Sequence, residues 1–335
     1  MSESPIRVLW LTPDKPENIS VGRRKIAEYL MTQGFDVTLR GTTTQMLVQS
    51  MRERNSYDVV VGTTRAGAIA GTLLSVVFSK PLLVDHIDPI RQFSETHPRW
   101  LSLPVRLLEN VSFALADHVL YVYDEEAQRV RRYARLATQT DLGVSFDRFA
   151  NPSDETLNRA RRRLDDEGVA GNVVIYVGGL EPIYNIEHLL EAMTHLSDWT
   201  LVVLGTGDLE SQVRTAATAR ENVVYLGTVP HDDVPGYLHA ADVGISLVDD
   251  AHTLKVLEYG SAGLPVVQLR GHAEGRFSGL ATFCSLDPAA IAEAIQTAIE
   301  TTDTAAMRAA SKRYDWASIG QVYESALRTI VTDQQ

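Results

Sequence analysis

The chain has 335 residues, a formal net charge of −12 and a single cysteine, Cys284. The acidic balance is the opposite of the basic footprint that nucleic-acid-binding surfaces carry, and one cysteine excludes a disulfide framework or a Cys-based zinc site. The length suggests about two domains, because single hydrophobic cores rarely grow beyond about 250–300 residues.

The N-terminal sequence enters a strand-like run, 6–12, without a signal-peptide pattern. The most apolar segment, 66–79, is shorter than the roughly 20 residues of a membrane-spanning helix, and Lys80 and Pro81 end it. From these two features we expect a cytoplasmic protein.

The first half alternates short apolar runs with helical patterns. Strands are predicted at 6–12, 36–41, 58–63, 81–87 and 118–124, and helices at 22–33, 44–54, 66–78 and 103–115. The strands are almost continuously hydrophobic, as expected for parallel strands that helices cover on both faces. Residues 1–150 are therefore predicted to form a doubly wound α/β domain.

A charged helix at 156–168 follows, within a linker predicted at 151–171. The alternation then restarts, with strands predicted at 172–179, 199–205, 223–227, 243–248 and 265–269 and helices at 186–196, 208–219, 232–240, 253–262 and 288–300. This pattern predicts a second doubly wound domain at 172–312, followed by a final packing helix at 313–335.

Two such domains would face one another across a cleft, and ligands of these sheets bind beyond the carboxyl ends of the strands. Two strands of the second half end in glycine turns, with Gly178 and Gly179 after the first and Gly205 and Gly207 after the second. Glycine lets a backbone approach a ligand closely, and a following helix N-terminus attracts an anion such as a phosphate. These turns fit nucleotide-binding proteins of many kinds.

Lys255 and Glu258 are three positions apart in the helix predicted at 253–262 and therefore share one face. The amides near Thr253 and Leu254, together with Lys255, could hold a diphosphate, and Glu258 could accept hydrogen bonds from ribose hydroxyls. The alternative is an exposed helix ion pair worth a few tenths of a kcal/mol.

The segment 225–267 contains "LGTV", "YLHAADVGISL" and "KVLEYGSAGLPVV" in order, after "VGGL" at 177–180. These motifs closely resemble those of family 4 glycosyltransferases (glycosyl transferases group 1), which have the GT-B fold. The linker "LGVSFDRF" at 142–149 and "RYDW" at 313–316 are also similar to the family's pattern. The resemblance is strong over 172–331 and weaker before it.

The resemblance implies two Rossmann-like domains facing across a cleft, the first for the acceptor and the second for a nucleotide-diphosphate sugar. It implies that the last helix crosses back to the first domain. It further implies a retaining, metal-independent hexosyltransferase with no cofactor other than the nucleotide sugar as co-substrate. The acceptor would be a glycan or a lipid-linked molecule.

Further site residues are implied by the same resemblance. Gly22 would lie near donor and acceptor, His86 near the transferred sugar, and Val229 beside the nucleotide. Asp250 would contact sugar hydroxyls, although Asp249-Asp250 could equally be a solvated turn. His86 and Asp88 are too few to define a metal site.

The basic residues Arg23, Arg24 and Lys25 would meet an anionic acceptor or form a solvated face. Segment 97–108 mixes arginines with leucines and Trp100, which is typical of a peripheral membrane contact at the inner face or of burial against the sheet.

The chain departs from the family at the first glycine turn. The family's Arg and Lys, which bind the donor's diphosphate, are Gly179 and Tyr184 here. This departure leaves three functions open: a transferase, an inactive sugar-nucleotide binding protein and a GT-B sugar-nucleotide epimerase. A dinucleotide oxidoreductase is disfavoured, because no strand is followed by G-x-G-x-x-G with an acid about 20 residues later.

Overall fold

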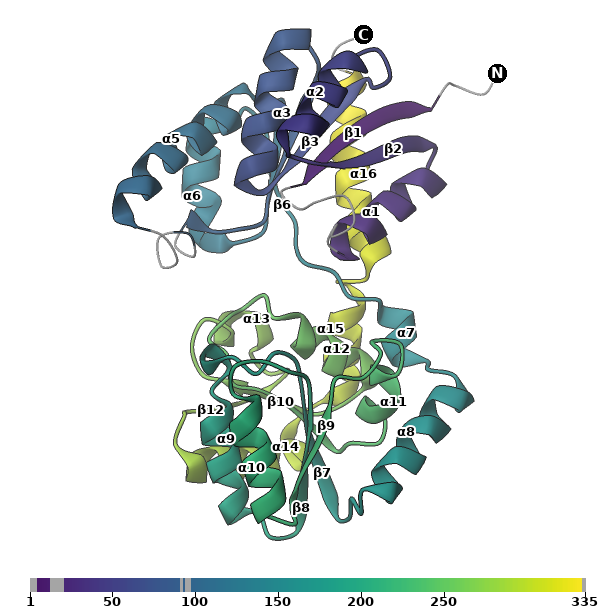
Figure 1. Cartoon of the computed structure of the whole chain (residues 1–335), viewed down its shortest axis with the longest axis vertical. Coiled ribbons are helices and arrows are strands. Elements are labelled where there is room, and N and C mark those ends of the chain that lie inside the picture. The colour runs from purple at the N-terminus through teal and green to yellow at the C-terminus, as the bar shows by residue number, and fades with distance from the viewer. Residues whose placement is uncertain (1–4, 13–20, 91–92, 94–97, 333–335) are drawn as a thin grey trace. The chain divides into compact units, whose positions relative to one another are not determined.

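A computed structural model describes residues 5–12, 21–90, 93 and 98–332 (Figure 1). The chain divides into two compact units. Unit 1 comprises Met1–Gly143 and Trp316–Gln335, and unit 2 comprises Val144–Asp315. Each unit has one sheet with helices on its faces.

The sheet of unit 1 has six strands in the order β2-β1-β3-β4-β5-β6, and all neighbours pair in parallel. The strands are β1 Ile6–Thr12, β2 Phe35–Gly41, β3 Val59–Thr63, β4 Leu82–His86, β5 His118–Tyr121 and β6 Ala137–Gln139. The helices are α1 Val21–Thr32, α2 Thr44–Arg52, α3 Thr64–Phe78, α5 Arg99–Leu115, α6 Asp124–Tyr133 and α16 Trp316–Thr332.

Unit 2 also has a six-stranded parallel sheet, in the order β12-β11-β10-β7-β8-β9. Its strands are β7 Asn172–Val177, β8 Trp199–Leu204, β9 Val223–Gly227, β10 Val243–Ser246, β11 Val266–Leu269 and β12 Thr282–Cys284. Its α-helices are α7 Phe146–Ala150, α8 Asp154–Asp166, α9 Ile186–Ala192, α10 Glu210–Ala219, α11 Val234–Leu238, α12 Leu254–Ala262, α13 Glu274–Phe277, α14 Pro288–Thr301 and α15 Thr304–Lys312. The doubly wound α/β architecture predicted for both halves is confirmed.

The unit boundary lies after Gly143, where we expected it after residue 150. Val144, Phe146 and Phe149 are buried in a core of unit 2, so the chain has already entered that unit. Helix α8 likewise packs on unit 2 through Ala160 and Leu164, and it is not a free linker.

Helix α16 returns to unit 1, where it lies beside α1 (Figure 1). A buried polar network holds it there. Arg23 on α1 donates two hydrogen bonds to Asp85 on β4, at 2.9 and 3.0 Å. Tyr323 of α16 donates to the same carboxylate at 2.7 Å, and Thr63 donates at 2.7 Å. Trp10 donates to Thr63 and stacks on Tyr323.

This network corrects the expectation for Arg23. Arg23 is 3% exposed and its guanidinium is hydrogen-bonded to Asp85 and Tyr323, so it does not form a solvated basic face or await an anionic ligand. Gly22 has a packing role as well, because a Cβ there would lie 2.6 Å from the Trp316 ring. The rest of the expected glycine loop, 13–20, lies outside the described residues.

Candidate functional site

The order of strands in unit 2 reverses between β7 and β10, which are neighbours in the sheet. Such a reversal leaves a crevice outside the carboxyl ends of the two strands, where ligands of open α/β sheets bind. The glycine turn at 178–179 follows β7, and the segment leading into α12 follows β10. The two motifs singled out in the sequence therefore meet at this edge.

The glycine turns pack directly on each other. A Cβ at Gly205 would overlap the carbonyl oxygen of Gly178, and one at Gly207 would lie 2.6 Å from the backbone nitrogen of Leu180. The backbones are joined by hydrogen bonds from Gly178 to Leu204 and from Leu180 to Thr206, both at 3.0 Å. Loop-to-loop packing thus requires these glycines whether or not a ligand is bound.

A cavity of about 320 Å³ opens beside the turns. This volume is at the lower end of the range of small-molecule sites. Its lining includes Gly178, Gly179, Gly205 and Val229, four of the residues predicted to border a nucleotide, together with His231.

Lys255 reaches from the first turn of α12 to the first glycine turn. Its Nζ donates a hydrogen bond to the Tyr176 hydroxyl at 3.1 Å and lies 2.9 Å from where a Cβ of Gly178 would be. The ammonium also lies 4.4 Å from the centre of the Tyr176 ring and 4.1 Å from that of Tyr184. Burial lowers the pKa of Lys255 to about 8, against the opposing charges of Glu258 and Glu181.

Glu258 shares the helix face with Lys255, but no ion pair joins them in the part of the chain that the structure describes. Its Oε1 lies 4.0 Å from Nε2 of His231, an imidazole whose pKa is lowered by burial and by the charge of Arg148. Burial raises the pKa of Glu258 to about 7, against the lowering charges of Arg148 and Lys255. The exposed helix ion pair considered as an alternative is therefore not formed.

The other predicted residues around α12 have local roles. Asp250 Oδ1 accepts a hydrogen bond from the backbone nitrogen of His252 at 2.8 Å, which is a turn contact. Asp249 accepts from the backbone of His272 at 2.7 Å. Thr253 is the N-cap of α12, but its side chain makes no capping hydrogen bond.

The first glycine turn, which lacks the family's Arg and Lys, is occupied by side chains from the residues that follow it. A Cβ at Gly179 would overlap Glu181 and would lie 3.1 Å from the Tyr184 ring. Tyr184 ends a one-turn 3-10 helix, Pro182–Tyr184. This corner therefore holds a carboxylate and an aromatic ring where the family pattern behind the resemblance has an arginine and a lysine.

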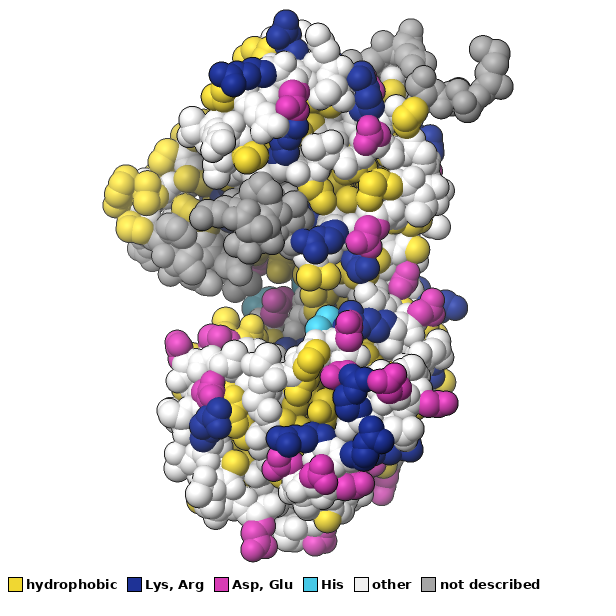
Figure 2. Space-filling model, turned by 45° about the vertical axis from the view of Figure 1, so that its right-hand side comes forward, with side chains coloured by type: hydrophobic (Ala, Val, Ile, Leu, Met, Phe, Trp, Pro, Cys, Tyr) yellow, Lys and Arg dark blue, Asp and Glu magenta, His cyan; other side chains and the backbone are white. Residues whose placement is uncertain are grey.

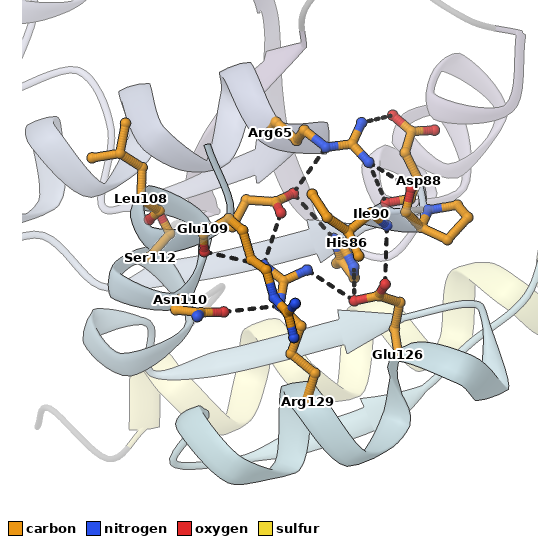
Figure 3. Close-up of polar contacts among 12 residues, drawn as sticks. Arg65, His86, Asp88, Ile90, Leu108, Glu109, Asn110, Ser112, Glu126 and Arg129 are labelled. Atoms are coloured by element: carbon orange, nitrogen blue, oxygen red, sulfur yellow. Dashed lines mark hydrogen bonds and ion pairs between the residues drawn. The ribbon is translucent and has the colours of Figure 1, made fainter. Parts of the chain in front are cut away.

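His86 ends β4 inside a network of charged side chains in unit 1 (Figure 3). Its Nε2 lies 3.2 Å from Glu126 Oε2, and its Nδ1 lies 3.9 Å from Glu109 Oε1. Arg129 donates to both carboxylates, at 2.9 Å to Glu126 and 2.8 Å to Glu109. Burial alone would raise the pKa of Glu126, but hydrogen bonds from His86 and the Ile90 backbone, with the charge of Arg129, lower it to about 2.

Asp88, two residues after His86, contacts Arg65. Its backbone oxygen accepts a hydrogen bond from Arg65 at 3.0 Å, and its carboxylate lies 4.0 Å from the same guanidinium. Over the described ranges, no group of three or more His, Cys, Asp or Glu side chains could hold a metal ion. Burial raises the pKa of the Asp88 carboxyl, partly offset by Arg65.

Sequence reasoning missed Tyr176, Glu181 and His231. Tyr176 looked like one more apolar residue of a buried strand, and only its ring contact with Lys255 sets it apart. Glu181 could have been recognised from the sequence, because it lies between Gly179 and Tyr184, the two positions at which the family's cations are absent.

Comparison with known proteins supports the resemblance. Residues 171–301 match the family model of Glycosyl transferases group 1. Over 154 residues the chain is 29% identical to TuaH of Bacillus subtilis (strain 168), a proposed teichuronic acid biosynthesis glycosyltransferase. That match covers 44% of this chain and 38% of TuaH, so this chain accounts for well under half of that relative.

Solved structures resemble the chain over nearly its whole length. Anabaena Alr3699/HepE, in complex with UDP and glucose, has a TM-score of 0.74 at 19% identity and covers 97% of this chain and 100% of its own. Sucrose-phosphate synthase of Thermosynechococcus elongatus has a TM-score of 0.75 at 16% identity, covering 98% and 100%. A glycosyltransferase of Rickettsia africae has 0.74 at 14%, covering 98% and 99%.

These likenesses and the two parallel sheets define the GT-B fold, made of two Rossmann-like units. Within that fold, the part of the chain that matches the Glycosyl transferases group 1 model, 171–301, contains the motifs at 225–267 that carried the resemblance.

Proposed function

We propose that this protein transfers a sugar from a nucleotide-diphosphate donor to an acceptor, with retention of configuration as the resemblance implies. The observation that carries the proposal is the position of Lys255. Its ammonium lies against the first glycine turn, at the reversal point of the sheet and near the 320 Å³ cavity lined by the same turn.

The step of such a transfer that most needs electrostatic stabilisation is the departure of the diphosphate. As the bond between the sugar's anomeric carbon and the phosphate oxygen breaks, negative charge develops on that oxygen. Lys255 and the N-terminal amides of α12 would stabilise this charge, and Glu258 would hold the ribose hydroxyls. Orienting roles for His86 and Asp250 rest on the resemblance alone, since their described contacts are internal to the protein.

The test is a panel of nucleotide sugars, beginning with UDP-glucose because UDP and glucose are bound in HepE. We expect one donor to raise the melting temperature, since a ligand at 100 times its Kd stabilises the folded state by about 2.7 kcal/mol. The same donor should release nucleotide when an acceptor is added, with or without EDTA. If no nucleotide sugar binds, the proposed function is wrong.

A second candidate is a sugar-nucleotide binding protein without turnover. Glu181 favours it, because this carboxylate fills the space beside Gly179 and would repel a diphosphate. Donor binding without transfer or hydrolysis, across glycan and lipid-linked acceptors, would support this candidate. Release of an epimerised free sugar would instead indicate an epimerase.

Helix α5 turns its apolar side chains outward. Trp100, Leu103 and Leu107 are 72%, 68% and 64% exposed, whereas Glu109 and Ser112 are buried. Hydrophobic side chains gather on this edge of unit 1 (Figure 2). Burial against the sheet, the alternative explanation of these leucines, is therefore wrong. A contiguous exposed apolar face marks an interaction surface.

We propose that this face makes the expected peripheral membrane contact within 97–108, of which residue 97 lies outside the described residues. Such a contact would favour a lipid-linked acceptor over a soluble glycan. It would be interfacial, because no helix in the described ranges is long and apolar enough to cross a bilayer. Arg106, exposed on the same helix, suits anionic headgroups.

Replacing Leu103 and Leu107 together with Ser should weaken binding to vesicles containing anionic phospholipid. Each buried leucine side chain stabilises by roughly 1.5–3 kcal/mol, so we expect at least a tenfold loss in co-sedimentation affinity. Met31→Ser on α1, at a side chain that is 49% exposed, is the control. Equal binding by the double variant and the wild type would contradict the membrane contact.

A further inference from the structure

The ammonium of Lys255 lies close to two tyrosine rings. Its Nζ is 4.1 Å from the centroid of Tyr184 and 4.4 Å from that of Tyr176, both within the range of attractive cation–π contacts. The Tyr176 hydroxyl accepts a hydrogen bond from this Nζ and donates one to the carbonyl oxygen of Gly179, at 2.6 Å. One ring therefore belongs to the strand that leads into the glycine turn, and the other belongs to the one-turn helix that follows it.

Tyr184 stands where the family pattern behind the resemblance has a lysine, so in this chain an aromatic ring takes the place of that cation. A lysine has a flexible four-carbon stem, and an unrestrained ammonium would have to be ordered when an anion binds. Glu181, close to the same turn, also attracts this ammonium electrostatically. The two tyrosine rings counter both the flexibility of the lysine stem and the attraction toward Glu181, because their contacts hold Nζ at one place over the turn.

We propose that Tyr184 is a positioning residue, whose ring holds the Lys255 ammonium over the glycine turn so that this cation is already in place when the donor's diphosphate binds. The inference rests on the proposed function, and it assigns Tyr184 no contact with the sugar. Because the ring acts and not the hydroxyl, Tyr184→Phe should behave as the wild type and Tyr184→Leu should not.

The position of Lys255 can be measured without any ligand. The chain has only five lysines, so selective ¹³C-lysine labelling gives few Cε–Hε signals, and Lys255→Met assigns the one of interest. Ring currents should shift the Lys255 signal upfield of that of Lys25, whose ammonium pairs with Glu28 at the surface. The shift should persist in Tyr184→Phe and move toward the Lys25 value in Tyr184→Leu.

The functional arm uses UDP-glucose, or whichever donor the panel identifies. Loss of one cation–π contact of about 1–2 kcal/mol corresponds to a five- to thirtyfold lower kcat/KM in Tyr184→Leu. We expect most of this loss to appear in kcat and little in KM, because negative charge develops on the diphosphate as it leaves the sugar. Tyr133→Leu, which removes an exposed ring beside Arg132 in unit 1, is the matched control.

Two results would overturn the inference. One is a Lys255 signal that is unchanged in Tyr184→Leu, which would mean that the ring does not hold the ammonium. The other is an equal loss of kcat/KM in Tyr184→Phe and Tyr184→Leu, which would assign the effect to the hydroxyl. Absence of donor binding by the wild type would instead contradict the proposed function. The lysine spectra need no donor, so they test the positioning role of Tyr184 separately from that function.

Discussion

Lys255→Met is expected to lower kcat for sugar transfer by about 10²–10³-fold, the usual effect of removing one group that stabilises charge in a transition state. The structure makes this loss large, because Gly179 and Tyr184 supply no cation beside the turn. The melting temperature should not fall, since a partly buried ammonium is replaced by an apolar side chain of similar length. Initial rates of nucleotide release, with and without acceptor, measure the effect.

Lys312→Met is the matched control, because Lys312 is an exposed lysine of the same unit and lies over the Phe146 ring. It should leave both kcat and the melting temperature unchanged. If Lys255→Met retained full turnover, the placement of the diphosphate at α12 would be wrong even if the protein proved to be a transferase.

The titration of Lys255 predicts how donor affinity depends on pH. Burial lowers the pKa of Lys255 to about 8, so its positive charge is present below that pH and is lost above it. Donor affinity should therefore fall as pH rises through about 8, whereas an ordinary lysine would keep its charge to about pH 10. Lys255→Arg removes the titration, because a guanidinium stays protonated, and its residual affinity should be flat over this range. A wild-type profile that is flat from pH 7 to 10 would contradict the assignment.

The second large effect is on stability. Asp85→Asn should destabilise unit 1 by about 3–5 kcal/mol, the typical cost of leaving a buried charge without its partner. Asp85 is 0% exposed and accepts hydrogen bonds from Arg23, Tyr323 and Thr63, so the substitution leaves the Arg23 charge buried and uncompensated. Tyr323→Phe removes one bond to a charged group and should cost about 1.5–3 kcal/mol.

Hydrogen exchange measured by mass spectrometry distinguishes destabilisation of unit 1 from destabilisation of unit 2. In Asp85→Asn, peptides from β4 and α16 should exchange much faster, while those from β8 in unit 2 should not change. Glu28→Gln on α1 breaks the exposed pair with Lys25 and should cost well under 1 kcal/mol. Uniformly faster exchange in both units would show that the network does not act within unit 1 alone.

Much of the fold could be predicted because parallel strands covered on both faces are nearly continuous apolar runs. The five strands expected in each half match β1–β5 and β7–β11 to within three residues at each end. The edge strands β6 and β12 were not assigned, since each has only three residues and three residues show no period. Helix α6 was missed because its sequence, DEEAQRVRRY, has few apolar residues to mark a buried stripe.

The sequence by itself determined the two doubly wound units and the pairing of glycine turns with a helix that begins near Lys255, because these are local patterns in one stretch of chain. Only the tertiary structure decided which side chains surround the lysine. Tyr176 and Lys255 are far apart in sequence and meet because β7 and β10 are neighbours in the sheet. The same holds for Arg23, whose basic side chain is buried because Asp85 and Tyr323 come from β4 and α16 to meet it. Such contacts depend on strand order, which no periodicity along the chain encodes.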